Sequence, residues 1–259
     1  FSLTVLRLGD TGTLSYVDQV LDSRDTRFAG LTAMDMLTLG NQVLVAAAGN
    51  DGGLSLFQML PTGRLILRDT LIDGAATALQ NIQDLRFVIV GDQIELFALA
   101  SADAGVTRIR LSPAQYAGTS GIMAASAGAD LLTAGQGGWI KGGAGDDILV
   151  AGPGVDTLEG GAGADLYVPM PDAAGRDVIL GFDPTADRID LSGFAFLHDA
   201  SGLTIRPTAR GAVIGIGATT LTVNAGYSLT ASALQAALLF NTDRLLTPVV
   251  PPLSTAIND

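Results

Sequence analysis

Three aspartates recur at a fixed spacing in the middle of the chain, and their surroundings indicate what they could bind. Residues 142–168 hold three consecutive nine-residue units, GGAGDDILV, AGPGVDTLE and GGAGADLYV. In each unit glycines come first, one aspartate follows (Asp147, Asp156 and Asp165), and a short apolar stretch ends the unit. Glycine lets the backbone turn with positive φ and expose its carbonyl oxygens. Carboxylate and carbonyl oxygens together form the all-oxygen ligand set that calcium prefers, so the repeat predicts calcium sites.

The elements that position these aspartates are short strands separated by glycine turns. The last three residues of each unit, with a large apolar residue at the centre, predict a strand, and two units make one coil of a parallel β-roll. Turns then stack on alternate sides, so each aspartate faces the turn eighteen residues away. Upstream, ASAGADLLT (125–133) keeps Gly128 and Asp130, whereas AGQGGWIK (134–141) is one residue short and lacks the aspartate. We expect the 134–141 turn to be a poor site.

The same units resemble the repeats of the RTX (repeats-in-toxin, haemolysin-type calcium-binding) family, whose nonapeptide GGxGxDxUx is a signature of a calcium-binding parallel β-helix. The resemblance covers residues 125–240. GRDVILGFDPTADRIDLSGF (175–194) is similar to the segment that closes such rolls, and residues 203–240 are similar to the trailing strands and C-terminal end of these proteins. The family implies a roll that calcium orders.

By position, the resemblance implies metal-binding roles for a defined set of residues. Asp130, Asp147 and Asp165 fall on one side of the roll and give two calcium sites between successive turns. Asp156 falls on the other side and pairs with Asp177, which gives a third site whose occupancy the sequence leaves open. The full set comprises Gly128, Asp130, Gly142, Gly143, Ala144, Gly145, Asp147, Gly152, Gly154, Asp156, Gly160, Gly161, Ala162, Gly163, Asp165, Gly175 and Asp177.

Other acidic residues of this region have less defined roles. Asp146 occupies a variable position of the repeat and is expected to face solvent. For Asp183, Asp187 and Asp190 the resemblance implies roll-capping roles, and solvent-facing turn carboxylates are an equal alternative. Residues 119–168 carry six acids and one base, so the carboxylates repel one another without a cation. We therefore expect the roll to fold when calcium binds.

Charge and composition limit the classes of function. The formal net charge of −12 argues against nucleic acid, because phosphate binding needs clustered basic residues. The chain has no cysteine, which excludes disulfides and thiolate-bound metals. No uninterrupted apolar stretch approaches the roughly 18 residues of a membrane span. Calcium is then the expected substitute for the disulfides that stabilise many extracellular proteins.

A longer repeat occupies the N-terminal part of the chain. LTVLRLGDTGTLSYVDQVLDS (3–23) aligns with LSLFQMLPTGRLILRDTLIDG (54–74) at a shift of 51 residues, and the same shift superposes residues 34–49 on 85–100. Each period contains four short strand-like runs, at 33–39, 42–48, 54–60 and 64–72. Four strands in a period of this length are typical of a β-propeller blade. A small β-sandwich built by duplication is the alternative.

The predicted fold class is therefore all-β. It consists of N-terminal β-propeller-like repeats, or a β-sandwich, followed by a calcium-binding parallel β-roll with a C-terminal β cap. The predicted domains are residues 1–118 (propeller-like repeats), 119–194 (RTX β-roll with capping segment), 195–246 (β cap and secretion-signal-like region) and 247–259 (proline-rich tail).

The sequence favours a protein that is not an enzyme. His198 is the only histidine, and neither a HExxH nor a GxSxG motif is present. We expect a secreted or surface-exposed, structural or adhesive calcium-binding protein, part of a surface layer, filament or virion spike. Its expected partners are calcium and an unidentified surface, glycan or protein that binds the N-terminal repeats, with a homo-oligomer or larger assembly and without nucleic acid. The resemblance implies export by type I secretion from a Gram-negative bacterium.

One alternative keeps the repeats and changes the class of function. The chain would be the C-terminal part of a secreted RTX hydrolase or toxin whose catalytic domain lies upstream of Phe1. The absence of an initiator Met at Phe1 leaves room for that domain, or for further blades. A sugar-binding lectin is less favoured, because Trp139 is the sole tryptophan and falls in a predicted roll strand.

Overall fold

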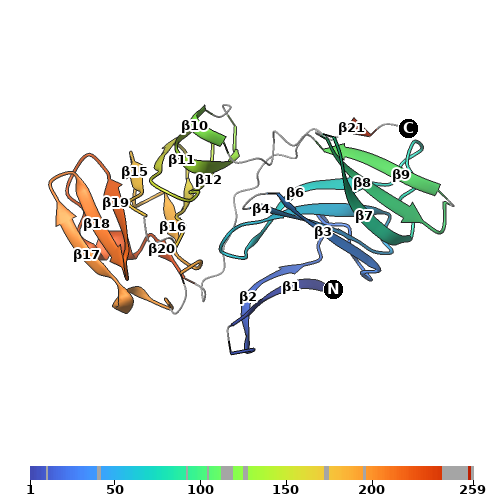
Figure 1. Cartoon of the computed structure of the whole chain (residues 1–259), viewed down its shortest axis with the longest axis horizontal. Coiled ribbons are helices and arrows are strands. Elements are labelled where there is room, and N and C mark those ends of the chain that lie inside the picture. Colours follow the sequence, from blue (N-terminus) through green and yellow to red (C-terminus); the bar gives the residue numbers. More distant parts are fainter. Residues whose placement is uncertain are drawn as a thin grey trace. The chain divides into compact units, whose positions relative to one another are not determined.

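The structure, a computed structural model, is almost entirely β and divides into two compact units (Figure 1). The first unit is Phe1–Ala117 with Pro251–Asp259, and the second is Gly118–Val250. The structure describes residues 1–9, 11–39, 42–91, 93–103, 105–111, 119–124, 128–171, 175–194, 197–240 and 256–257. Residues 125–127 of the first predicted nonapeptide, and the predicted tail 247–259 apart from 256–257, lie outside the described residues.

The first unit contains three antiparallel sheets that follow one another along the chain (Figure 1). Sheet 1 is the hairpin of β1 (Ser2–Leu8) and β2 (Leu14–Leu21). Sheet 2 is a four-stranded meander of β3 (Ala33–Leu39), β4 (Gln42–Ala48), β5 (Gly53–Met59) and β6 (Leu65–Ile72). Sheet 3 is a meander of β7 (Ile82–Val90), β8 (Gln93–Ala100) and β9 (Gly105–Leu111), to which β21 (Ala256–Ile257) adds as the fourth strand.

These sheets pack through apolar faces, as consecutive blades of a propeller do. Strand alternation gives each sheet two faces. One face of sheet 2 shares a buried core with sheet 3, which includes Leu44, Leu54 and Ile94. Its other face shares a smaller core with sheet 1, which includes Leu3 and Phe57. The predicted all-β class of this region is therefore confirmed, and the sheets follow one another along the chain as the 51-residue period predicts.

The 51-residue period is repeated in the hydrogen bonds of the turns between sheets. Thr26 Oγ1 donates to Asp22 Oδ1 at 2.9 Å in the turn that leads from sheet 1 to sheet 2. The equivalent Thr77 Oγ1 donates to Asp73 Oδ1 at 3.2 Å in the turn that leads from sheet 2 to sheet 3. Such side-chain bonds fix a turn locally. Both sheet-to-sheet connections are thus fixed by the same pair of residue types.

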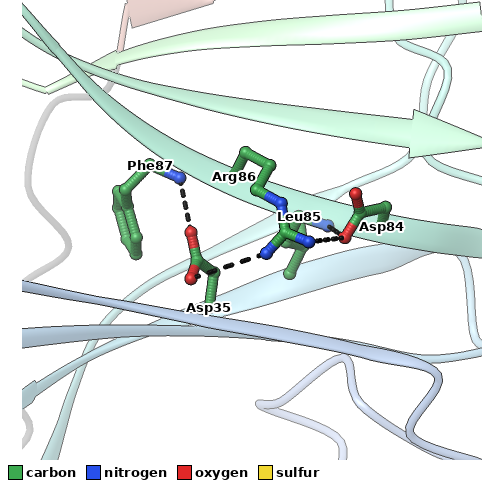
Figure 2. A network of polar contacts seen from close by, with 5 residues as sticks. All are labelled: Asp35, Asp84, Leu85, Arg86 and Phe87. Atoms are coloured by element: carbon green, nitrogen blue, oxygen red, sulfur yellow. Dashed lines mark hydrogen bonds and ion pairs between the residues drawn. The ribbon is translucent and has the colours of Figure 1, made fainter.

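A polar contact also joins sheets 2 and 3 (Figure 2). Asp35 on β3 accepts a hydrogen bond from the backbone N–H of Phe87 on β7 at 2.7 Å. The guanidinium of Arg86 lies 4.0 Å from the other oxygen of Asp35 and 3.4 Å from Asp84. Because β7 is an edge strand, Asp35 takes up one of the N–H groups on the edge of sheet 3.

The second unit is a parallel β-roll with a C-terminal cap. One parallel ladder runs in the order β10 (Thr119–Ala124), the second half of β11 (Leu131–Ala144), β13 (Thr157–Ala162) and β15 (Val178–Leu180). The other runs in the order of the first half of β11, β12 (Ile148–Val150), β14 (Leu166–Val168) and β16 (Arg188–Asp190). β11 passes through both ladders, and it spans residues 134–141, where the repeat is one residue short.

Between the two ladders lies the core of the roll. The large apolar residue of each repeat unit points inward, and Ile140, Leu149, Leu158 and Tyr167 are all buried in one cluster. Each strand of the roll contributes only one such large side chain per unit. The roll therefore has a thin core, and much of its backbone lies in the turns between strands.

The cap continues both ladders at the C-terminal end of the roll. An antiparallel meander of β17 (Thr204–Thr208), β18 (Gly211–Ile216) and β19 (Thr219–Asn224) pairs β19 with β15. The helix α1 (Ala231–Gln235), which Thr230 caps, precedes β20 (Leu238–Leu239), which pairs with β16. Among the described residues, no helix is long and apolar enough to cross a membrane.

Candidate metal centre

A column of aspartates runs along one edge of the roll. The backbone N–H of Asp130 donates to Asp147 Oδ1 at 2.8 Å, and that of Asp147 donates to Asp165 Oδ1 at 3.0 Å. The N–H of Asp165 donates in turn to Asp187 Oδ1, also at 3.0 Å. The structure thus brings Asp130, Asp147 and Asp165 together on one side, in the predicted order, and extends the column to Asp187.

The second carboxylate oxygen of two of these aspartates is buried without a hydrogen bond. Asp147 is 0% exposed and Asp165 is 2% exposed, and Oδ2 of each has no hydrogen-bond partner. Burying an ionised oxygen without a partner is unfavourable by several kcal/mol, on the order of the desolvation penalty of an ion. A divalent cation coordinated by these oxygens removes that penalty. The orphaned oxygens are therefore the observation that fits a metal.

The glycines of the turn leave the space around these oxygens open. A Cβ at Gly142 would lie 2.2 Å from Asp147 Oδ2 and 2.6 Å from the carbonyl oxygen of Gly160. A Cβ at Gly160 would lie 1.9 Å from Asp165 Oδ2. All three distances are far below a normal contact, so a side chain at either position would fill the space beside the carboxylate. The carboxylate and a carbonyl oxygen border the same space at Gly142.

Burial also changes the acidity of the column. Loss of solvent raises the pKa of Asp147 to about 6, and the charges of Asp130 and Asp146 add to that effect. Burial likewise raises the pKa of Asp165 to about 6, with further contributions from Asp187 and Asp147. Hydrogen bonds from backbone N–H groups act in the opposite direction. Without a cation, each carboxylate is therefore less stable in its charged form than an exposed aspartate.

The remaining glycine positions bring the turns close to one another. Gly143, Gly145, Gly161 and Gly163 all have positive φ, from 100° to 139°. A Cβ at Gly163 would lie 2.1 Å from the carbonyl oxygen of Gly145, in the turn before it. Ala144 pairs with Ala162 in the parallel ladder, and Gly128 lies against Gly145. The parallel strand pairing therefore continues into the glycine turns. The repeat pattern had predicted a strand only for the last three residues of each unit.

On the opposite edge, two aspartates form a shorter version of the column. The backbone N–H of Asp156 donates to Asp177 Oδ1 at 2.9 Å, which brings these two residues together. The N–H of Gly152 donates to Asp156 Oδ2 at 3.0 Å. Gly154 in the same turn has a positive φ of 105°. The carbonyl oxygen of Gly175 accepts a hydrogen bond from the backbone N–H of Thr220 in the cap. Asp156 and Asp177 are 0% and 2% exposed, so this edge also buries carboxylates.

Asp187 closes the column rather than continuing it. Its Oδ1 accepts from Asp165 N–H and its Oδ2 accepts from Asp183 N–H at 2.9 Å. Both of its oxygens therefore have partners within the protein, in contrast to Asp147 and Asp165. Of the two sequence alternatives for Asp187, the buried capping position is the one observed. Asp183 itself is exposed and accepts from Thr185 within its own turn.

Two further residues of the site were not anticipated from the sequence. Tyr167 takes the large apolar position of the last repeat, and its hydroxyl accepts from Gly160 N–H at 2.9 Å, beside Asp165. Asp146 is exposed, as expected, but its Oδ1 also accepts from Ala164 N–H at 2.7 Å, eighteen residues further on. Two features of the sequence could have indicated these roles. A tyrosine, which carries a hydroxyl, occupies the apolar position of the last repeat, and GGAGDD contains an additional aspartate before Asp147.

The donor set of this edge decides which metals it suits. Among the described residues no group of three or more His, Asp or Glu side chains converges on one point. Each turn of the column instead offers one carboxylate together with backbone carbonyl oxygens. This all-oxygen set suits a hard cation such as calcium and does not suit zinc, which takes nitrogen and sulfur ligands in its structural sites.

Comparison with known families agrees with this geometry. Residues 139–167 match the family model of the RTX calcium-binding nonapeptide repeat, which comprises four copies of the repeat. This segment is an array of RTX calcium-binding repeats. The matched residues contain Asp147, Asp156 and Asp165, and with them the two orphaned oxygens. The predicted RTX resemblance and the parallel β-roll are therefore confirmed, and calcium is the metal that these repeats bind.

Three solved structures are similar to this chain over part of its length. The AlgE6R3 subunit of the mannuronan C5-epimerase from Azotobacter vinelandii is 24% identical and covers 55% of this chain and 93% of its own, with a TM-score of 0.37. The AlgE6R2 subunit of the same enzyme is 24% identical, covers 48% and 95%, and has a TM-score of 0.35. The extracellular lipase LipA from Serratia marcescens is 16% identical, covers 80% and 32%, and has a TM-score of 0.32. No curated protein matches the chain.

Proposed function

We propose that this protein is a secreted or surface-exposed, non-enzymatic protein whose RTX roll folds when calcium binds. In this proposal the roll is a segment that calcium orders after export, and the N-terminal sheets are the platform that binds a surface, glycan or protein. The role is structural or adhesive, in a surface layer, filament or virion spike. The single observation that carries the calcium-dependent part is the pair of buried, unbonded Oδ2 atoms of Asp147 and Asp165.

Two features of the roll support calcium-dependent folding. Its strands between the turns are as short as three residues, as in β12 and β14. Ordering a backbone residue costs about 1–2 kcal/mol, and although every residue of these two strands is buried, each strand has only three side chains to offset that cost. The buried carboxylates add repulsion when no cation is present. Folding free energy that comes from a metal couples binding to folding, as in small metal-dependent domains.

The proposed number of ions follows from the two edges. The column Asp130, Asp147 and Asp165 provides two sites between successive turns, and the opposite edge provides one between Asp156 and Asp177. Extracellular calcium modules bind in the range of about 10⁻⁴–10⁻³ M. At the much lower free calcium of a bacterial cytoplasm the roll would stay unfolded, which suits export in an extended form by type I secretion.

A non-enzymatic role is supported by what surrounds the one histidine. His198 is exposed, and it lies next to Asp199, whose carboxylate caps the short turn of residues 200–202. A catalytic histidine acts as a general acid or base on a group within hydrogen-bond reach, and the neighbouring Asp199 carboxylate already caps a turn. Turnover by the purified chain in a panel of ester, peptide and glycoside substrates would overturn this part of the proposal.

Calcium titration calorimetry on chelator-treated protein tests the site assignment. We expect the intact chain to bind three ions, Asp147→Asn to lose the two sites of its column, and Asp156→Asn to lose one. Asp146→Asn is the matched control, since it removes the neighbouring exposed carboxylate. Equal calcium binding by the Asp146 and Asp147 variants would contradict the assigned register, and no binding at millimolar calcium would contradict the function.

A further inference from the structure

The sheets at the two ends of the N-terminal stack expose apolar residues at positions that are buried in the middle of the stack. We call the outer face of sheet 1 the leading face; it comprises Leu6, Leu8, Leu14 and Tyr16, which are 49%, 68%, 64% and 57% exposed. We call the outer face of sheet 3 the trailing face; it comprises Val88, Val90, Leu99 and Val106, which are 41%, 52%, 47% and 61% exposed.

The 51-residue repeat identifies what covers a leading face. The residues of sheet 2 equivalent to Leu6 and Leu14 are Phe57 and Leu65, which are 1% and 8% exposed because sheet 1 packs on them. The strand pairing is also equivalent, since Leu8 pairs with Leu14 in sheet 1 as Met59 pairs with Leu65 in sheet 2. The leading face is therefore built like a surface that another sheet covers.

The same comparison identifies the surface that does the covering. Leu99 and Val106 of sheet 3 pair across β8 and β9 as Ala48 and Leu54 pair across β4 and β5. Ala48 and Leu54 are both 0% exposed, because this face of sheet 2 packs against sheet 3. The trailing face is thus equivalent to the face of sheet 1 that covers sheet 2 and to the face of sheet 2 that covers sheet 3.

Charged groups on the trailing face are compatible with such packing. Glu95 is 8% exposed and lies 3.9 Å from Arg108 and 3.4 Å from Arg110. The carboxylate is therefore paired within the face itself. A partner surface would not need to supply a compensating charge for it.

We propose that the leading face of one copy of this chain packs against the trailing face of a second copy, so that copies associate head to tail. Each chain then continues the sheet-on-sheet packing already present between sheets 1 and 2 and between sheets 2 and 3. A contact between two different faces is heterologous, so it produces closed rings or open filaments rather than a symmetric pair. This extends the structural role in the proposed function, and it depends on the N-terminal unit and not on calcium.

The mass of the full chain in solution, measured by light scattering and sedimentation velocity from micromolar to submillimolar concentration, tests the association. We expect the mass to rise with concentration both in calcium and in chelator. Persistence in chelator separates this inference from the calcium-dependent function, since the two can fail independently. A wild-type chain that stays monomeric throughout would overturn the inference, and the faces would then belong to another partner.

Two charge substitutions distinguish the geometry. Leu14→Glu alters the leading face and Val106→Glu alters the trailing face, and each should weaken self-association by about 100-fold, as at a well-packed contact. Ile72→Glu is the control, because Ile72 is 59% exposed but lies in neither face. Both target side chains are exposed in the single chain, so circular dichroism should show unchanged folding.

Mixing the two variants gives the decisive result. Each variant keeps one intact face, so an equimolar mixture of Leu14→Glu and Val106→Glu should form heterodimers although each alone is monomeric. Because the heterodimer has no further pair of intact faces, it should not grow. If Val106→Glu associates like the wild type while Leu14→Glu does not, the leading face pairs with itself, and the head-to-tail arrangement is wrong.

Discussion

The two units of this chain are both built from repeats, yet they are stabilised by different means. In the N-terminal unit, β4 and β5 of sheet 2 bury apolar side chains on both faces of the sheet. One face contributes Leu44 and Leu54 to the core shared with sheet 3, and the other contributes Phe57 to the core shared with sheet 1. The roll instead buries carboxylates at Asp147 and Asp165 beside strands of three residues. The first pattern is stabilised mainly by the hydrophobic effect. In the proposed function the second also needs a bound cation, so its stability should depend on calcium.

The sharpest test of this difference uses glycine substitutions in the two units. In the roll, Gly160→Ala places a Cβ on Asp165 Oδ2 and beside the hydroxyl of Tyr167, and it should destabilise the calcium-bound roll by about 3 kcal/mol or more. In sheet 3, Gly91 has a φ of 64° with no atom near its Cβ position, so Gly91→Ala should cost only about 1–2 kcal/mol. Thermal unfolding in calcium and in chelator measures both.

The two variants should differ in how their loss of stability depends on calcium. Gly160→Ala should reduce the stabilisation that calcium gives, whereas Gly91→Ala should shift stability equally with and without calcium. Equal behaviour of the two variants would mean that the space beside Asp165 is not where calcium acts.

Removing one charge from the column should have the next largest effect. Asp147→Asn keeps an oxygen for the Asp130 N–H bond but loses the orphaned anionic oxygen, and calcium affinity should fall by at least about 100-fold. Asp146→Asn, one residue earlier, should change it less than threefold or so. Calorimetric affinities of the two variants provide the comparison, and a similar fall in both would show that the exposed aspartate is a ligand.

The two units should also respond to pH in opposite directions. The folded-state pKa values of Asp147 and Asp165 are raised to about 6. In chelator, the stability that their protonation provides is present below their unfolded value, near 4, and is lost as pH rises through about 6. In calcium the trend should reverse, because the ion competes with protons.

Asp73, in the turn before sheet 3, behaves in the ordinary way. Burial opposes the change, but hydrogen bonds from Leu79, Gln80 and Thr77 lower its pKa. Its contribution is present above the unfolded value and is lost only as pH falls further. Chemical denaturation of the chelated protein between about pH 2.5 and 7.5, followed separately for each unit, checks both trends. A chelated roll that gains stability with rising pH would contradict the assignment.

The smallest expected effect concerns a strand residue of the roll that does not bind the metal. Trp139 is 37% exposed, and Lys141 Nζ lies 4.5 Å from the centre of its ring. Trp139→Ala should cost about 1 kcal/mol through lost packing and cation–π attraction, with the number of bound calcium ions unchanged. Calorimetry of this variant separates strand packing from ligation, and loss of an ion would show that the two are coupled.

The sequence predicted the roll better than the residues that end it. The column Asp130, Asp147 and Asp165 followed from spacings of 17 and 18 residues, because parallel coils stack residues one turn apart. Asp187 could not be placed in the column, since it lies 22 residues after Asp165 rather than eighteen and only the folded capping segment brings it back into register.

In the N-terminal unit, the period predicted the strands but not the faces. Which side of a strand is covered depends on the neighbouring sheet, so Phe57 and Leu6 look alike in sequence yet are 1% and 49% exposed. The addition of β21 to β9 was likewise invisible, because it joins residues near the C-terminus to residues in the middle of the chain.

Hydrogen exchange of the full chain, measured by mass spectrometry with and without calcium, is the most direct test of calcium-dependent folding of the roll. We expect calcium to protect strongly the amides of residues 142–168, and most of all those of Asp147 and Asp165, whose N–H groups form the column. The amides of residues 42–59 should exchange equally slowly in both conditions. Equal protection of the roll with and without calcium would show that its buried carboxylates need no cation, and the account would be wrong.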